Sequence, residues 1–130
     1  MTRALMEGVV FSLRDSLEIM RELGTEVDQV RATGGGARSS LWRQLQADVY
    51  GLPIHRTTAD EGPAHGAALL SGVAAGVYRD VEEACSTVRL REEVTEPERT
   101  GIYEELYDVY RSLYPATQSA MHSLADLTGV

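Results

Sequence analysis

The sequence contains no lysine, a single cysteine and no long hydrophobic run. Without lysine, the chain cannot carry the Gly-Lys-Ser/Thr loop of P-loop proteins, the lysine of protein kinases or Schiff-base chemistry. The lone Cys85 cannot form an internal disulfide, which fits a reducing cytoplasmic compartment. No apolar run approaches the ~20 residues of a membrane-spanning helix, and Glu7 and Arg14 interrupt the segment that a signal peptide would keep apolar. We therefore expect a cytoplasmic protein without a membrane partner.

The composition is that of an ordinary globular domain. The 130 residues are 43% hydrophobic and 25% charged, enough for one domain with its own core. The net charge of −8 repels polyanions, so we expect no binding to nucleic acid. The three histidines and Cys85 lack metal-ligand spacing, and there is no Gly-x-Ser-x-Gly elbow. With no self-contained set of nucleophile, base and electrophile, the residues indicate part of a binding site rather than a whole enzyme.

The most distinctive stretch is the segment 33–42, TGGGARSSLW. Three glycines, Gly34, Gly35 and Gly36, separate a weak strand pattern at 27–33 from a helix pattern at 40–50. Glycine permits positive φ and close approach of a ligand, and the serines that follow offer a helix N-cap whose N–H groups attract anions. This layout predicts a nucleotide cradle, although it also occurs as a plain connection. A dinucleotide fingerprint is excluded, because position 39 is serine.

The rest of the first half predicts helices around short strands. An amphipathic helix is expected over 3–23, with Arg14 on its polar face and the chain starting inside a domain. Its expected apolar face comprises Leu5, Val9, Leu13, Leu17 and Met20, with Met6 and Val10 beside them. The helix over 40–50 should bury Leu41, Leu45 and Val49 and end at Gly51. Residues 53–56 are expected to form a strand at a sheet edge, because Pro53 opens it.

The second half predicts four further helices, the last a short terminal one marked by Met121, Leu124 and Leu127. Residues 61–77 form a pattern of small residues with Asp60 as N-cap, and Gly66 and Gly72 point to tight packing against a sheet or behind a ligand cleft. A short helix is expected from Asp80, a strand at 88–90 and a polar connection from Glu92 to Arg99. The cleanest helix covers 101–114 and should end at Pro115.

Four tyrosines lie on one face of this last helix. They could suggest a base-stacking platform, but the net charge favours a structural stripe with hydroxyls at its edge. Glutamates such as Glu93 and Glu104 are expected on solvated faces.

Three segments resemble, in order, motifs of the FGGY-family carbohydrate kinases. Residues 3–15 are similar to the family's RAVLEGVAFSLRD helix, 33–48 to its adenosine loop and following helix, and 61–69 to its EGxAxGAA helix. The version at 61–69 and the tyrosine-bearing helix look most like the family's xylulose kinases. The similarity runs to about residue 114.

The resemblance implies an α/β fold, as a partial C-terminal domain of the actin-like, sugar-kinase and heat-shock ATPase fold. Such a domain has three layers, with a small central sheet and flanking helices, and residues 1–130 would form it as a single partial domain. By similarity, Gly35, Gly36 and Ala37 would line the ribose and phosphates of ATP, Ser40 would lie near the adenine edge, and Gly34 would shape the turn. The aspartate base, the Mg²⁺-associated acid and the sugar-binding residues would lie in N-terminal sequence that is absent here, so no catalytic or metal-binding residue is expected.

The expected function is that of the ATP-binding C-terminal portion of a kinase that converts ATP and D-xylulose to ADP and D-xylulose 5-phosphate. Another family member, acting on gluconate, ribulose, glycerol or fuculose, and a non-catalytic interaction domain remain alternatives. The chain alone should be inactive, bind the sugar only with the missing domain, and bind nucleotide near millimolar strength. An unpaired sheet edge and uncovered apolar helices should make it a homodimer.

Overall fold

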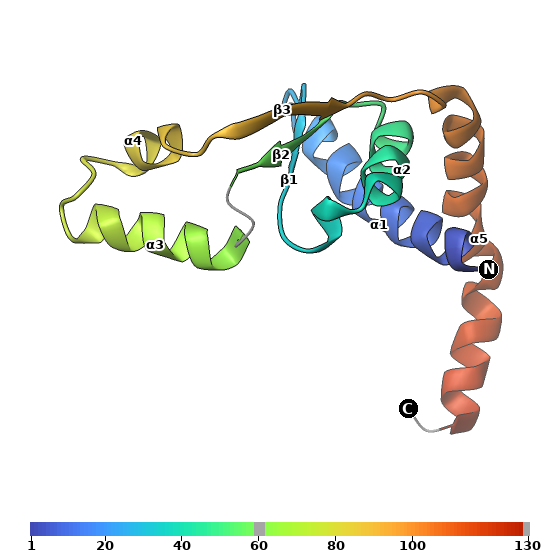
Figure 1. Cartoon of the computed structure of the whole chain (residues 1–130). Coiled ribbons are helices and arrows are strands. Elements are labelled where there is room, and N and C mark those ends of the chain that lie inside the picture. The colour runs from blue at the N-terminus through green and yellow to red at the C-terminus, as the bar shows by residue number, and fades with distance from the viewer. Residues whose placement is uncertain (59–61, 129–130) are drawn as a thin grey trace.

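The computed structural model describes residues 1–58 and 62–128. Helices and strands alternate along these residues, which confirms the predicted α/β class with a small central sheet and flanking helices (Figure 1). The elements are α1 Thr2–Glu22, β1 Val30–Ala32, the 3₁₀ turn η1 Gly36–Arg38, α2 Ser40–Tyr50, β2 Ile54–Thr57, α3 Gly62–Ala74, α4 Val81–Ser86, β3 Leu90–Thr95 and α5 Thr100–Thr128.

The three strands lie in the order β1-β2-β3, with β1 parallel and β3 antiparallel to β2. The prediction of an edge strand at 53–56 is therefore wrong, since β2 is central. Pro53 lies just before the strand and contributes its carbonyl, which accepts the Val30 N–H at 3.0 Å, so no donor from proline is needed. β3 also begins later than the predicted strand at 88–90 and occupies part of the expected polar connection.

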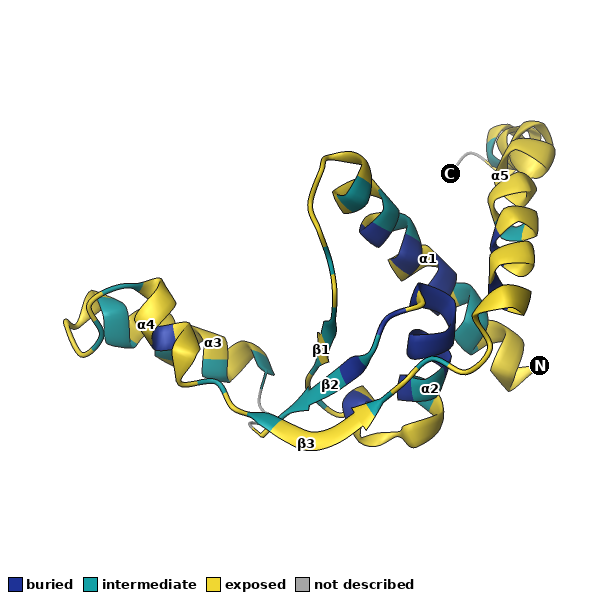
Figure 2. Cartoon of the chain, turned by 90° about the horizontal axis from the view of Figure 1, so that it is seen from above, coloured by how far each residue is buried: buried dark blue, intermediate teal, exposed yellow. Residues whose placement is uncertain are grey.

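The core lies where α1, α2 and α5 meet the inner end of the sheet (Figure 2). Val10, Val49 and Ile54 are its largest fully buried side chains. Gly51 ends α2 as predicted, with a left-handed φ of 64° that favours glycine. Two elements adjacent in the core, α1 and α5, are thus drawn from opposite ends of the chain.

The buried face of α1 is not the predicted one. Phe11 and Leu17 are buried with Val10, whereas four of the five residues of the predicted stripe are exposed. These are Leu5, Val9, Leu13 and Met20. Both stripes are apolar, and α1 buries the one that faces α2 and α5. Packing against these two helices, rather than the sequence of α1 itself, determines which stripe is buried.

Arg14 is buried on that same face, although its charge predicted a solvated position. Its guanidinium donates to the Val49 carbonyl at 2.9 Å and to the Glu104 carboxylate at 2.6 Å, so Glu104 is not merely a solvated surface charge. It also lies over the Tyr107 ring, 4.1 Å from the ring centre. Burial disfavours the charge, but the hydrogen bonds that Arg14 donates to Glu104 and Glu18, with the charges of these carboxylates, outweigh it and raise the pKa of Arg14.

Tyr103 and Tyr107 form the structural stripe predicted for the last helix. Both rings are buried against Phe11 of α1, and their hydroxyls meet polar groups at the edge of the core. The Tyr103 hydroxyl accepts from Arg3 and donates to Glu7, each at 2.9 Å. The Tyr107 hydroxyl donates to the Asp15 carboxylate at 2.6 Å. The polar ends of these rings therefore fix the register between α1 and α5.

Tyr107 should make the protein sensitive to alkali. Burial and the Asp15 carboxylate raise the pKa of Tyr107, against a smaller opposing effect of Arg111 and Arg14. A raised pKa favours the protonated phenol in the folded chain, so its stabilisation is complete below the unfolded pKa of ~10 and is lost above it. We expect urea-unfolding stability to fall more steeply between about pH 9 and 11 than in Tyr107→Phe. The exposed Tyr114 gives the control Tyr114→Phe; equal slopes in all three proteins would contradict the assignment.

The small-residue helix α3 does not pack against the sheet, so that prediction is wrong for the described residues. It has no buried residue, and with α4 it extends beyond the end of the sheet (Figures 1 and 2). A Cβ at Gly72 would lie 2.8 Å from the Tyr78 ring, whereas one at Gly66 would meet open space. The close packing at Gly72 is therefore with the turn that follows α3. The predicted cap Asp60 lies outside the described residues. The short helix expected from Asp80 is α4, and Asp80 is its N-cap, accepting from Glu83 N–H at 2.8 Å.

Helix α5 continues through Pro115 to Thr128, so the prediction that proline ends it is wrong. Proline removes one helical donor, but residues 111–120 are exposed, so water can bind the carbonyl that it frees. Although α5 is long, no helix among the described residues has a stretch apolar enough to cross a membrane.

Candidate functional site

The glycine turn lies between the end of β1 and the start of α2. Gly34 has φ of 78°, a conformation that favours glycine, and reverses the chain after the strand. Its carbonyl accepts from Ala37 N–H, and that of Gly35 from Arg38 N–H, each at 3.2 Å, which closes the 3₁₀ turn. Gly35 and Gly36 are exposed, and within residues 1–58 and 62–128 their N–H groups have no acceptor. The turn thus presents two backbone donors to solvent.

The start of α2 follows directly. Ser39 rather than Ser40 is the N-cap, and its hydroxyl accepts from Trp42 N–H at 3.3 Å. Ser40 is the first helical residue, is exposed, and lines a hollow of about 360 Å³ between α2 and β3. Because the helix dipole makes this end positive, a negative group is favoured beside the two free amides.

Two of the segments singled out in the sequence meet at this turn. A Cβ added to Gly62, the first residue of α3, would lie only 2.7 Å from the Thr33 hydroxyl oxygen. The start of α3 therefore touches the end of β1, just ahead of the glycines. The structure brings together the segments 33–42 and 61–69 through this contact.

Arg43 fixes the glycine turn through hydrogen bonds, a role that was not predicted from the sequence. Its buried guanidinium donates to the Ala37 carbonyl at 2.8 Å, to the Glu93 carboxylate at 2.7 Å and to the Thr95 hydroxyl at 3.1 Å. It thereby ties the turn to β3, and Glu93 is more than the solvated charge that was expected. The predicted face placed Leu41 inside, yet Leu41 is half exposed. The available signal was a second periodic face of α2, which the structure buries: Arg43, Gln46, Ala47 and Tyr50.

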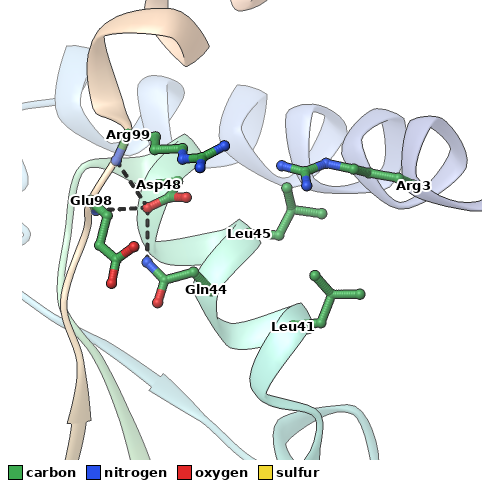
Figure 3. A pocket seen from close by; sticks show the side chains of 7 residues that line it. All are labelled: Arg3, Leu41, Gln44, Leu45, Asp48, Glu98 and Arg99. Carbon is green, nitrogen blue, oxygen red and sulfur yellow. Dashed lines mark hydrogen bonds between the residues drawn. The ribbon is translucent and has the colours of Figure 1, made fainter.

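Asp48 anchors the other end of α2. Its buried carboxylate accepts from Gln44 Nε2 at 2.9 Å and from the backbone N–H groups of Glu98 and Arg99 at 2.7 and 3.2 Å (Figure 3). It lines a hollow of about 190 Å³ into which the side chain of Arg99 also points. The two hydrogen bonds from Glu98 and Arg99 fix the connection that leads into α5, so Asp48 stabilises the structure around the turn.

The turn has the chemistry of an anion site without a metal. In the described ranges, no group of three or more His, Cys, Asp or Glu side chains is arranged to hold a metal ion. Two exposed amides, a helix N-terminus and the lack of a side chain on Gly35 and Gly36 suit the phosphates or ribose of a nucleotide.

Comparison with known families decides the relationship. The model of the FGGY family of carbohydrate kinases, C-terminal domain, matches residues 1–75. This chain belongs to the FGGY family of carbohydrate kinases. The resemblance seen in the three sequence segments is thereby confirmed, and with it membership of a phosphotransferase family.

FGGY relatives match nearly the whole chain. Xylulose kinase from Staphylococcus epidermidis is 38% identical over 128 residues, which cover 97% of this chain and 26% of that protein. L-xylulose/3-keto-L-gulonate kinase from Escherichia coli is 40% identical over 118 residues, covering 89% and 24%. Xylulose kinase from Rhodospirillum rubrum superposes with a TM-score of 0.74 at 27% identity, over 92% of this chain and 25% of that one. The chain spans about a quarter of the length of these kinases and has the fold of their C-terminal part.

Proposed function

We propose that this chain provides the nucleotide-binding surface of an FGGY kinase of the xylulose kinase type. The full-length enzyme would convert ATP and D-xylulose to ADP and D-xylulose 5-phosphate. The observation that carries the proposal is the pair of exposed amides at Gly35 and Gly36, which have no acceptor among the described residues and lie just before the α2 N-terminus. The family relationship supports a phosphoryl donor as the anion that these amides meet.

Each residue of the turn has a distinct role in the proposal. Gly34 sets the reversal, and the amides of Gly35 and Gly36 bind the phosphates and approach the ribose. Ala37 is buried and its carbonyl accepts a hydrogen bond from Arg43, so in the proposal Ala37 forms a fixed surface against which the ribose packs. Ser40 is exposed and lies at the adenine edge.

The remaining chemistry belongs to sequence that this chain does not contain. ATP supplies the phosphoryl group when bound, and Mg²⁺ offsets the charge that develops during its transfer. The residues described here bind and orient the nucleotide, whereas the Mg²⁺ ligands, the aspartate base and the sugar site would come from the remaining three quarters of a full-length kinase. The chain alone is accordingly expected to show no kinase activity and to bind nucleotide weakly.

Replacing Gly36 with valine tests the cradle. The new Cβ would lie 3.5 Å from Trp42 Nε1, an ordinary contact, so the fold should tolerate it, while the branched side chain would block close approach of a ligand. We expect the isolated chain to bind ATP with a Kd of about 1 mM and the variant to lose this binding by tenfold or more. The measurement is an NMR titration that follows the amides of the glycine turn.

Gly101→Val is the matched control, because Gly101 lies at the start of α5, away from the turn, and its added Cβ would meet open space. It should bind ATP as the wild type does. A folded Gly36→Val protein with unchanged affinity would remove the turn from the site. A folded wild-type chain that binds no nucleotide would favour the non-catalytic interaction domain instead.

A further inference from the structure

Helix α5 carries one apolar seam along its whole length. Its members recur in strict alternation of four- and three-residue steps, the repeat of helices that pack side by side. They are Tyr103, Tyr107, Tyr110, Tyr114, Thr117, Met121, Leu124 and Thr128. A second row, Leu106, Leu113, Ala120 and Leu127, lies beside it at seven-residue spacing.

The first half of this seam already has a partner. Phe11 of α1 packs against Tyr103, Tyr107 and Tyr110, with ring centres 6.2, 5.9 and 5.3 Å apart. The repeat continues unchanged into the second half, which we call the α5 tail, residues 113–128. This part projects past the end of α1, away from the rest of the chain (Figure 1).

The α5 tail leaves the seam open. Tyr114, Met121 and Leu124 are 59%, 53% and 62% exposed, and Leu127 of the second row is more exposed still. Isolated apolar residues at a surface need no explanation, but a contiguous row in register with an existing helix interface indicates a further helix.

The distribution of charged residues indicates which helix packs against the α5 tail. Residues 112–125 contain no Asp, Glu, Lys or Arg, although the chain as a whole carries −8. Asp126 is the one charged residue of the α5 tail, and in an antiparallel pair the two copies of Asp126 lie at opposite ends, so two tails can pair without like-charge repulsion between them. In an antiparallel pair, tails of this length at 1.5 Å per residue would keep the two charged bodies about 20 Å apart, beyond the ~8 Å over which salt at physiological strength screens charges.

We propose that the α5 tail forms an antiparallel two-helix dimer with the tail of a second copy of this chain. Each copy presents the same surface, so the contact closes with two-fold symmetry and adds no further copies. The surface differs from the sheet edge and the α1 and α3 faces on which the sequence-based expectation of a homodimer rested. An interface between two short helices lies below the ~1,200 Å² of standard complexes, so we expect micromolar rather than tighter dissociation.

The test measures mass by light scattering after gel filtration, from micromolar to near-millimolar protein, without nucleotide. The wild-type mass should rise from 14.2 kDa towards twice that value. Met121→Glu combined with Leu124→Glu places charges in the seam of each copy and should raise the Kd by about a hundredfold or more. Ser119→Glu combined with His122→Glu makes the same charge change on the opposite side of the tail and should leave the dimer intact. Circular dichroism confirms that each variant folds.

Three outcomes would overturn the proposal. One is a constant monomer mass up to near-millimolar wild-type protein. Another is a dimer that survives the Met121/Leu124 variant, which would move the contact to another surface such as the β1 edge. The third uses the Staphylococcus epidermidis relative without its C-terminal quarter: if that piece binds the seam and dissolves the dimer, the tail's partner is the remainder of a kinase rather than a second copy.

Discussion

Replacing Arg14 with methionine should lower the free energy of unfolding by about 3 kcal/mol or more. The stem and its packing are retained, but the Val49 carbonyl loses its buried donor and Glu104 loses its partner across the α1–α5 contact. The stacking on Tyr107 is lost as well. Such a change is a large part of the 5–15 kcal/mol that stabilises a typical domain, so much of the protein should be unfolded at elevated temperature. Urea titration followed by circular dichroism measures it.

The control for Arg14 is Arg79→Met. Arg79 also forms an ion pair, with Asp80 at 2.8 Å, but its side chain is 81% exposed, and such pairs contribute little. We expect the control to unfold at the wild-type urea concentration with an unchanged slope. Matching midpoints for both variants would mean that the buried pairing of Arg14 adds no stability beyond that of a surface pair.

Replacing Arg43 with methionine should also cost about 3 kcal/mol, and should in addition loosen the glycine turn. The guanidinium is the shared donor for Ala37 of the turn and for Glu93 and Thr95 of β3, so its loss leaves the Ala37 carbonyl without that buried donor. We expect lower urea stability together with faster amide exchange in the turn and in β3. Arg43→Lys keeps the charge but not the three-directional donor geometry, so it should recover only part of the loss.

Arg99→Met provides the comparison, because Arg99 is exposed and contributes its backbone N–H to Asp48. Amide exchange at Ala37 and Arg38, whose N–H groups close the turn, should be unchanged in this variant. If Arg43→Met lowered stability while leaving amide exchange in the turn at the wild-type rate, Arg43 would stabilise the core without fixing the glycine turn.

Local signals in the sequence predicted the elements around the candidate site well. The serine pair and Gly51 marked both ends of α2, and the three glycines marked the turn before it. These signals act over a few residues: a hydroxyl caps the nearest free N–H, and only glycine adopts positive φ without strain. The position of the glycine turn could therefore be predicted from the sequence alone.

Packing was much less predictable, and the buried arginines show why. Periodicity assigns arginine to the surface, but Arg14 and Arg43 are buried because backbone carbonyls of Val49 and Ala37 face them in the fold. For Arg14 that partner is 35 residues away, beyond the reach of any pattern within one helix. The same limit applies to α3, whose sequence predicts a helix but not the surface it meets.

The contacts that complete the core join the two ends of the chain. Arg3 meets Tyr103 across 100 residues, and Asp15 meets Tyr107 across 92. Closing such long loops costs conformational entropy, which is offset only once the contacts have formed. We therefore expect this chain to fold more slowly than a chain of the same length whose contacts are local. During synthesis, α1 emerges from the ribosome before α5, so Phe11 and Arg14 stay without their tyrosine partners until α5 has emerged. This core therefore stays incomplete until α5 has been made, and α1 depends for its final packing on a helix that follows it at long sequence separation.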